Sequence, residues 1–125
     1  MYPGAETPPH VQRWDLLALD APDGTRDPIV LHSDDGARAV LVVLRPGQKL
    51  GDHQVKENAW VTVLEGEVDI TGGDGATERG GPGTMVRFEP DERHALRSEG
   101  GARILLLLAP WPGQGHYRGG DGARA

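Results

Sequence analysis

The 125-residue sequence predicts an all-β domain, a sandwich or barrel of short strands. Three observations support this class. Short apolar runs recur along the chain, turn signals rich in Gly, Pro and Asp separate them, and no segment carries an apolar stripe of helical spacing over a useful length. A chain of this length is expected to form one domain with its own core.

Eight apolar runs are the predicted strands. In chain order they span 14–19, 29–32, 39–44, 60–64, 67–71, 85–88, 94–97 and 103–108. The turn signals between them read, in order, PDG, DDG, RPG, EG, GGDG with GGPG, and PDE. Each has a backbone reason, since Gly supplies a positive φ, Pro restricts φ and Asp caps its own turn.

Two of the runs, VLVVL at 40–44 and ILLLL at 104–108, are continuously apolar rather than alternating. A strand that is apolar on both faces is covered on both sides. We therefore expect a second layer over the outer face, supplied either by a second subunit in a homodimer or by this chain's own N-terminal arm. The Gly- and Pro-rich ends predict an arm at 1–12, one domain at 13–112 and a tail at 113–125.

Composition limits the partners and the chemistry. The formal net charge is −6, from 13 Lys and Arg against 19 Asp and Glu, which argues against a nucleic acid or an anionic membrane as partner. The chain has no cysteine, which excludes disulfides, thiolate metal sites and cysteine nucleophiles. The start, MYPGAETPPH, lacks the pattern of a secretory signal, and the longest apolar run is too short to span a bilayer. We expect a cytoplasmic protein.

A histidine motif follows the third predicted strand. Pro46-Gly47 is followed by five residues and then His53, with Val55 two positions later, Ala59 four further on and Gly66 at the end. This spacing resembles the first motif of the cupin superfamily, whose members are small double-stranded β-helix, or jelly-roll, barrels. That motif has a second histidine where Val55 stands and a glutamate where Ala59 stands.

A second motif of the same family is matched further along the chain. Gly83 and His94 stand at its first glycine and its histidine. The remaining motif positions are held by Glu89 beside Pro90, by Asp91 for a glycine and by Ser98 for an asparagine. The resemblance covers residues 46–98 and implies a cupin-type barrel, a fold that hosts many unrelated activities.

The resemblance also implies a divalent metal held by the motif residues inside the barrel, but only His53 and His94 remain of that set. Zn²⁺ usually has three or four protein ligands, and non-haem Fe(II) has two histidines and a carboxylate. Glu57 completes such a set if its loop folds inward; otherwise it is a solvated residue beside Lys56. The expected cofactor is therefore either none or one ion of Fe, Mn, Ni or Zn.

Without a metal, His53 and His94 are expected to be two imidazoles facing one partly enclosed cavity with Val55 and Ala59 in its apolar wall. An unperturbed imidazole titrates near neutral pH, so either ring could hydrogen-bond a ligand or act as a general acid or base. The alternative is that both are remnants whose polar atoms are satisfied by the nearby backbone.

Four further side chains near the motifs have expected places. Arg87 lies either on the cavity face, where its guanidinium would clamp a carboxylate through two hydrogen bonds, or on the outer face. Trp60 follows Ala59 and is expected on the opposite face, either in a packed core or at a subunit interface. Arg97 and Arg103 are expected at the surface.

These features predict a small-molecule-binding cupin of unassigned chemistry with a weak or absent metal site. One alternative is an enzyme, either a metal-dependent dioxygenase or isomerase, or a metal-free isomerase or cyclase that uses His53 and His94 for acid–base work. A second alternative is a purely structural or partner-binding barrel.

Overall fold

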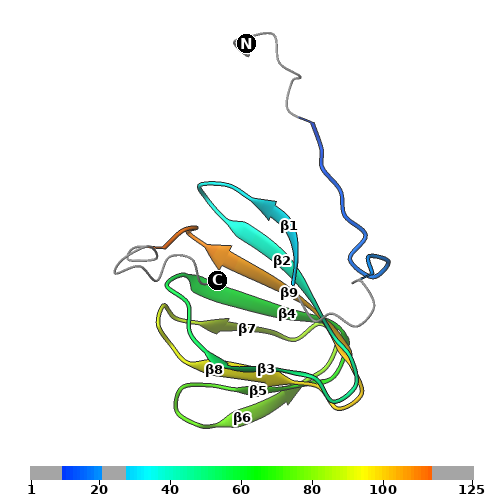
Figure 1. The fold of residues 1–125 in the computed structure, drawn as a ribbon, viewed down its shortest axis with the longest axis vertical. Helices are drawn as coiled ribbons and strands as arrows, with labels where there is room; N and C mark the ends of the chain where they lie inside the picture. Colours follow the sequence, from blue (N-terminus) through cyan, green and yellow to red (C-terminus); the bar gives the residue numbers. More distant parts are fainter. Residues whose placement is uncertain (1–9, 21–27, 114–125) are drawn as a thin grey trace.

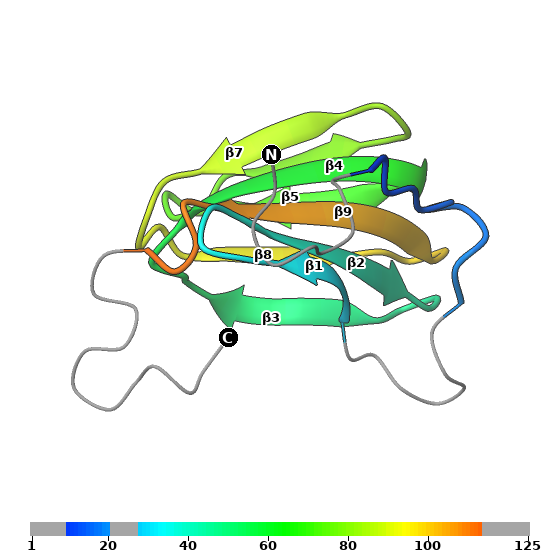
Figure 2. The ribbon, with the colours of Figure 1, turned by 90° about the horizontal axis from the view of Figure 1, so that it is seen from above.

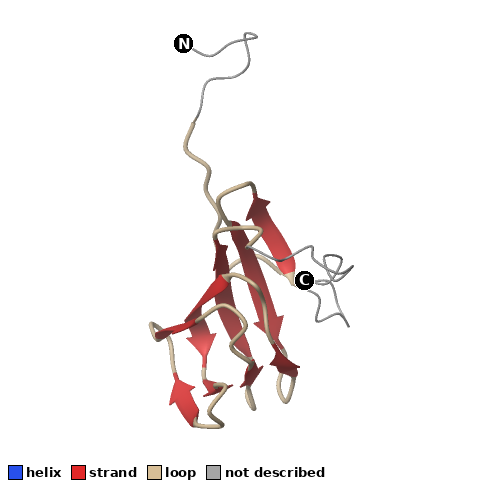
Figure 3. Cartoon of the chain, turned by 90° about the vertical axis from the view of Figure 1, so that its left-hand side faces the viewer, coloured by secondary structure: helices blue, strands red, loops and turns tan. Residues whose placement is uncertain are grey.

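The computed structural model describes residues 10–20 and 28–113, with the side chains of Asp52 and His53 left out of that description. These ranges hold nine strands and no helix, which confirms the all-β class (Figure 3). The strands are β1 (Ile29–Ser33), β2 (Arg38–Leu44), β3 (Lys49–His53), β4 (Asn58–Gly66), β5 (Val68–Thr71), β6 (Thr77–Gly80), β7 (Met85–Phe88), β8 (His94–Arg97) and β9 (Ala102–Ala109). Nothing in the described part of the chain is a helix with the length and apolar character needed to cross a membrane.

The strands form two antiparallel sheets. One has five strands in the order β1-β2-β9-β4-β7, and the other has four in the order β3-β8-β5-β6 (Figure 1). Seen from above, the edge strands β7 and β3 lie at opposite sides of the molecule (Figure 2). No strand of one sheet is hydrogen-bonded to a strand of the other in these orders. The described strands therefore form a two-sheet jelly roll rather than the closed barrel that the sequence predicted.

The core lies between the two sheets because buried apolar residues on the inner face of each strand alternate with more exposed residues on the outer face. In β4, Ala59, Val61 and Val63 are buried while Trp60 between them is exposed, as period-two alternation predicts. The five-stranded sheet adds Ile104 on β9, and the four-stranded sheet adds Leu96 on β8 to the same cluster.

Two predicted features of the strand pattern need correction. The run 14–19 is not a strand; the N–H groups of Ala18 and Leu19 both donate to the Asp15 carbonyl in a turn. The polar strands β3 and β6 were not predicted, because KLGDH and TERG hold too few apolar residues to be recognised. Both are edge strands of their sheet, where one ladder of backbone hydrogen bonds and one packed face are enough to hold a polar segment.

The segment 10–20, called the arm below, is attached to the sandwich through Arg103 on β9. The Arg103 guanidinium donates to the carbonyls of Leu16 and Leu19 and pairs with Asp20. Its side chain is only 13% exposed, so the expectation of a surface arginine was wrong. Arginine reaches this degree of burial because its five donors can be satisfied by several acceptors at once.

Candidate functional site

His94 begins β8 and points into the space between the sheets. It is 3% exposed and shares the inner face of β8 with Leu96. Its ring stacks on Phe88, the last residue of β7, with the ring centroids 4.2 Å apart and the planes within 10° of parallel. The strand predicted at 94–97 therefore begins on a buried imidazole held against an aromatic wall.

A backbone contact determines which ring nitrogen of His94 carries a proton. Nδ1 lies 3.0 Å from the carbonyl oxygen of Glu92. A carbonyl oxygen only accepts, so Nδ1 is the donor and, in the neutral ring, Nε2 holds the lone pair. Nε2 is therefore the acceptor nitrogen of the neutral ring.

The backbone brings His53 beside His94. The two residues are Cα partners across the antiparallel pair β3–β8, and the register shifts between Leu50 and His53. Since Leu50 pairs with Leu96, an unbroken register would set Asp52 opposite His94. The irregularity sets His53 there instead. The sequence predicted that the two histidines come together, but it held no sign of this shift.

Asp91 occupies a position where the family motif has a glycine, and it adopts a glycine-like backbone. Its φ is 67°, in the left-handed region that aspartate tolerates better than most residues. Its N–H donates to the Val55 carbonyl at 2.7 Å, and its carboxylate accepts from Lys56 Nζ at 2.8 Å. These bonds tie the loop before β4 to the loop before β8, so both loops border His94.

Ser98 replaces the asparagine of the second motif and has a structural contact. Its hydroxyl is buried and donates to the Glu67 carbonyl at 2.6 Å. This bond joins the end of β8 to the start of β5, at the opposite end of β8 from His94. It holds the four-stranded sheet together rather than contributing to the histidine site.

Glu57 is neither a solvated loop residue nor, among the described side chains, part of a metal-binding group. It is completely buried, so the solvent-exposed interpretation was wrong. Its Oε2 accepts from the N–H of Gly113, beyond the end of β9, at 2.7 Å. A Cβ at Gly113 would lie 2.4 Å from the carbonyl oxygen of Lys56, so only glycine fits there. The hydrogen bond between Gly113 and Glu57 holds the segment after β9 against the loop before β4.

The sequence analysis did not identify Gly113 or the neighbouring Trp111 as structural residues. Trp111 is buried, and its backbone N–H donates to the Gly36 carbonyl at 3.3 Å. The Arg38 guanidinium lies over its ring, 4.7 Å from the ring centre. Trp111 falls inside the predicted domain 13–112, whereas Gly113 was assigned to the tail. The Pro-Trp-Pro-Gly sequence after the last strand is the signal that could have extended the packed segment to Gly113. The rest of the predicted tail, 114–125, and residues 1–9 of the predicted arm lie outside the described residues.

Arg87 lies on the outer face of the five-stranded sheet. Its guanidinium donates to Asn58 Oδ1 at 2.7 Å and lies 5.7 Å from the ring centre of Trp60. Phe88, the next residue, is the one that faces His94. The sequence allowed Arg87 on either the cavity face or the outer face. The structure has it on the outer face, so Arg87 and the buried Ala59 lie on opposite sides of the sheet.

Two of the four metal-ligand positions of the family carry no donor atom for the divalent metal that the fold suggests. Val55 and Ala59, at two of the four family ligand positions, offer only hydrocarbon and pack in or against the core. The Glu57 carboxylate holds Gly113. Among the described side chains, which leave out His53, no three His, Asp or Glu groups lie close enough to hold an ion.

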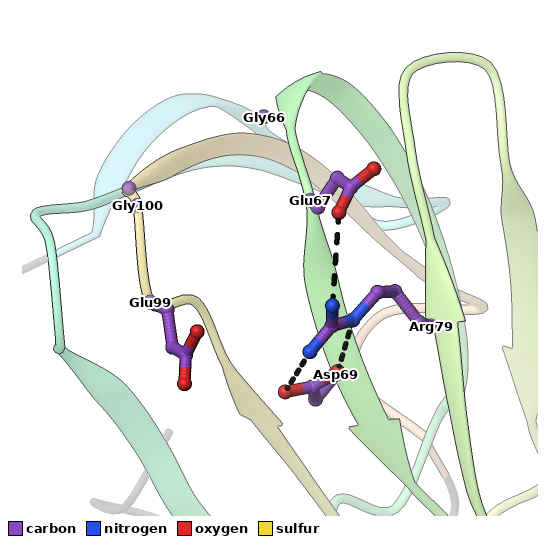
Figure 4. A pocket seen from close by; sticks show the side chains of 7 residues that line it. Gly66, Glu67, Asp69, Arg79, Glu99 and Gly100 are labelled. Atoms are coloured by element: carbon purple, nitrogen blue, oxygen red, sulfur yellow. Dashed lines mark hydrogen bonds and ion pairs between the residues drawn. The ribbon is translucent and has the colours of Figure 1, made fainter.

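A polar depression of about 280 Å³ lies at the opposite end of β4 from Ala59. Its lining residues are Gly66, Glu67, Asp69, Arg79, Glu99, Gly100 and Gly101. Figure 4 shows the Arg79 guanidinium turned toward Asp69, with Nε–Oδ1 at 2.9 Å, and also facing Glu67. The hydrogen bond from Arg79 lowers the pKa of Asp69, despite the opposing effect of desolvation. Because Arg79 is engaged by carboxylates, the depression is a salt-bridged surface.

Comparison with solved structures gives the fold of the chain. It is similar to TT1209 from Thermus thermophilus, with 25% identity, a TM-score of 0.71, and coverage of 80% of this chain and 98% of that one. An RmlC-like cupin from Desulfovibrio desulfuricans matches at 22% identity and TM-score 0.72, covering 81% and 98%. SPY1581 from Streptococcus pyogenes, a conserved protein of unknown function, matches at 24% and 0.68, covering 81% and 89%. No curated protein matches the sequence.

The family model for the cupin domain matches residues 40–109, from the second strand to the last. This range holds both histidine motifs, the buried His94 and the loops tied together by Asp91. It confirms the resemblance that the motif spacing indicated. The chain belongs to the cupin family.

Proposed function

We propose that this protein binds a small organic molecule beside His94 and does so without a metal ion. One observation carries the proposal: a buried imidazole whose Nδ1 is held by the Glu92 carbonyl has its Nε2 as an oriented acceptor. The surrounding residues Phe88 and Ala59 are apolar. A few oriented polar atoms within an apolar lining are typical of small-molecule sites.

The chemistry of the lining suggests the class of ligand. Nε2 of neutral His94 accepts a hydrogen bond, so the ligand carries a hydroxyl, an N–H or a protonated carboxyl group. The flat face of Phe88 is covered by the imidazole itself. We expect a compact ligand that is mostly hydrocarbon, because Ala59 and Phe88 are apolar. The Cα pairing of His53 with His94 supports His53 as the second polar residue of the proposed site.

A ligand panel tests the proposal. Small alcohols, phenols, lactones and carboxylic acids are added one at a time, and the melting temperature is followed. A ligand at one hundred times its Kd adds about 2.7 kcal/mol to the free energy of unfolding. We expect a binder to shift wild type and the control variant His32→Phe equally and to leave His94→Phe unshifted. His32 is a suitable control because it is half-exposed and paired with Asp34. If every shift persists in His94→Phe, the site is elsewhere.

Metal content tests whether the protein works without a metal ion. Elemental analysis is carried out on wild type purified without chelators and on the double variant Val55→His with Ala59→Glu. The two substitutions restore imidazole and carboxylate at positions that now hold hydrocarbon. We expect no stoichiometric metal in wild type, and Mn²⁺ or Ni²⁺ binding by calorimetry in the variant. Stoichiometric metal in wild type would contradict the proposal.

The His94 tautomer also favours a second candidate, metal-free acid–base catalysis on a bound small molecule. The Glu92 carbonyl holds the proton on Nδ1, so Nε2 is oriented to act as a base. Under this candidate, a ligand found by the panel is converted to an isomer or a cyclised or dehydrated product. Turnover must then be lost in both His53→Ala and His94→Ala; conversion that survives in either variant rules the candidate out.

A further inference from the structure

An arginine that the motifs did not indicate lies on the same inner row of the five-stranded sheet as Phe88, whose ring stacks on His94. Cα pairs across β2, β9, β4 and β7 define this row, which consists of Arg38, Leu108, Ala59 and Phe88. Residues directly opposite each other in an antiparallel sheet share a face. Since Leu108, Ala59 and Phe88 are buried in the core, the row runs along the inner face; Figure 1 shows the four strands side by side.

The Arg38 guanidinium packs on an aromatic ring. It lies over Trp111, 4.7 Å from the ring centre, and Trp111 belongs to the same buried cluster as Leu108 and Ala59. Arg38 itself is partly buried. A guanidinium packed on a ring still offers the N–H donors around its edge. Within residues 10–20 and 28–113, no acceptor is hydrogen-bonded to those donors and no carboxylate is paired with them.

Arginines on the outer face of the other sheet differ from Arg38 in this respect. Arg79 is paired with Asp69, and Arg97 with Glu99. Carboxylates are also in excess in this chain, with 19 Asp and Glu against 13 Lys and Arg. An inward-facing guanidinium that none of the described carboxylates neutralises is suited to an anion supplied by a ligand. Its planar fork matches a carboxylate through two parallel hydrogen bonds.

The inner face is accessible beside this row. The neighbouring inner row consists, across the same four strands, of Val40, Leu106, Val61 and Val86. Leu106 and Val86 pack against the core but are only partly buried, and so is Leu50 on β3 of the opposite sheet. The accessible interior is therefore apolar. A molecule lying on Leu106 and Val86 has Arg38 on its β2 side and His94 on its β7 side.

We propose that Arg38 binds the carboxylate of an organic acid whose other end donates a hydroxyl or N–H group to Nε2 of His94. The two side chains recognise different groups, because a guanidinium only donates hydrogen bonds, whereas Nε2 of the neutral imidazole accepts one. The apolar surface between them matches the hydrocarbon that separates the two polar groups in a hydroxy acid or an amido acid. This inference rests on the proposed function, since it names the class of ligand for the His94 site.

Calorimetry on the full chain tests the inference with 6-hydroxyhexanoate, 8-hydroxyoctanoate and 4-hydroxybenzoate, each compared with its methyl ester. The ester keeps the hydroxyl group and loses the charge. We expect at least one acid to bind wild type about tenfold more tightly than its ester, and Arg38→Gln to remove that preference, since the charge-assisted pair is lost. Arg97→Gln, which removes an exposed arginine paired with Glu99, is the matched control and should bind as wild type does.

Thermal unfolding verifies that each variant is folded. Arg38→Met, whose thioether can still pack on Trp111, replaces Arg38→Gln if the latter does not fold. An acid preference that survives in the folded Arg38 variant overturns the role of Arg38, and the proposed function still stands if His94→Phe abolishes binding. Binding of the esters alone has the same meaning. If none of the three acids binds wild type, the inference is overturned, and the proposed function fails with it only when the wider ligand panel gives no shift either.

Discussion

Single residues that the motifs left unexplained hold the histidine end of this cupin together. Glu57 is the clearest example, since a fully buried carboxylate is costly unless hydrogen bonds compensate for lost water. Its bond to the Gly113 N–H links the loop before β4 to the chain beyond β9. A loop residue that was considered as a third metal ligand therefore holds, through its carboxylate, the backbone of Gly113.

Replacing Glu57 with alanine is expected to lower the free energy of unfolding by about 1–3 kcal/mol, because the buried Gly113 N–H loses its acceptor. Glu57→Gln keeps an oxygen and nearly the same volume, so its loss should be smaller. Urea denaturation measures both. Glu78→Ala on the exposed β6 strand is the control, expected within about 0.5 kcal/mol of wild type. Equal stability of Glu57→Ala and wild type would contradict the anchor role.

At the scale of elements, turns and cross-strand pairs hold the strands in register. Gly66 ends β4 with a φ of 81°, and a Cβ there would lie 2.1 Å from the Gly101 carbonyl oxygen. Gly75, in the turn between β5 and β6, has nearly the same φ of 84° but only open space around it. Alanine substitutions at the two glycines therefore distinguish the free-energy cost of backbone strain from the cost of a steric clash.

Gly75→Ala should therefore cost only the left-handed strain of an L residue, about 1–2 kcal/mol. Gly66→Ala carries the same strain and also forces two backbone segments apart, so its loss should be clearly larger or should prevent folding. Denaturant unfolding of the two variants, each against wild type, makes the comparison. A similar loss of unfolding free energy in both variants would show that the Gly101 backbone moves away from residue 66 at little cost.

The pair of Asp69 on β5 and Arg79 on β6 gives the hairpin a dependence on pH. The hydrogen bond from Arg79 lowers the pKa of Asp69 from its usual 3.8. A carboxyl with a depressed folded-state pKa stabilises the fold above its unfolded pKa, and this contribution is lost as pH falls through the folded value. Arg79→Gln removes it. The difference in melting temperature between wild type and Arg79→Gln should be constant near neutral pH and shrink below pH 3.8. A difference that grows on acidification would contradict this assignment.

At the scale of the whole molecule, Arg103 connects the arm to the sandwich. It binds two arm carbonyls and Asp20, while Glu65 on β4 faces it from the sheet at 3.4 Å. One side chain therefore joins residues that are more than eighty positions apart in the chain. This long-range contact holds the arm against β9.

Arg103→Ala is expected to release the arm and leave the sandwich folded. The amides of Ala18 and Leu19, which donate to Asp15 in the arm's turn, should then exchange with solvent faster. The amides of β4 and β9 should keep their protection. Hydrogen exchange followed by mass spectrometry measures both sets, and Arg97→Ala, which removes an exposed arginine, is the control. Unchanged exchange in the arm would mean that Arg103 does not hold it.

Much of the strand pattern could be predicted, because alternation and turn chemistry are local. Ala59 and Trp60 were assigned to opposite faces correctly, since period two needs only neighbouring residues. The same reasoning failed for the run 14–19, whose leucines looked like a strand, but in the structure Arg103 rather than a neighbouring strand binds its carbonyls. It also missed β3, a polar edge strand with too few apolar residues to show the pattern.

By itself, the sequence determined the all-β class, the family, and the presence of two histidines with hydrocarbon at the other expected ligand positions. These follow from residue identity and spacing, which a chain carries before it folds. Only the tertiary structure decided that Glu57 is buried against Gly113, that Arg87 faces outward and that Arg103 holds the arm. The reason is physical: the burial of a charged side chain depends on which distant backbone groups arrive beside it, and long-range packing alone determines that.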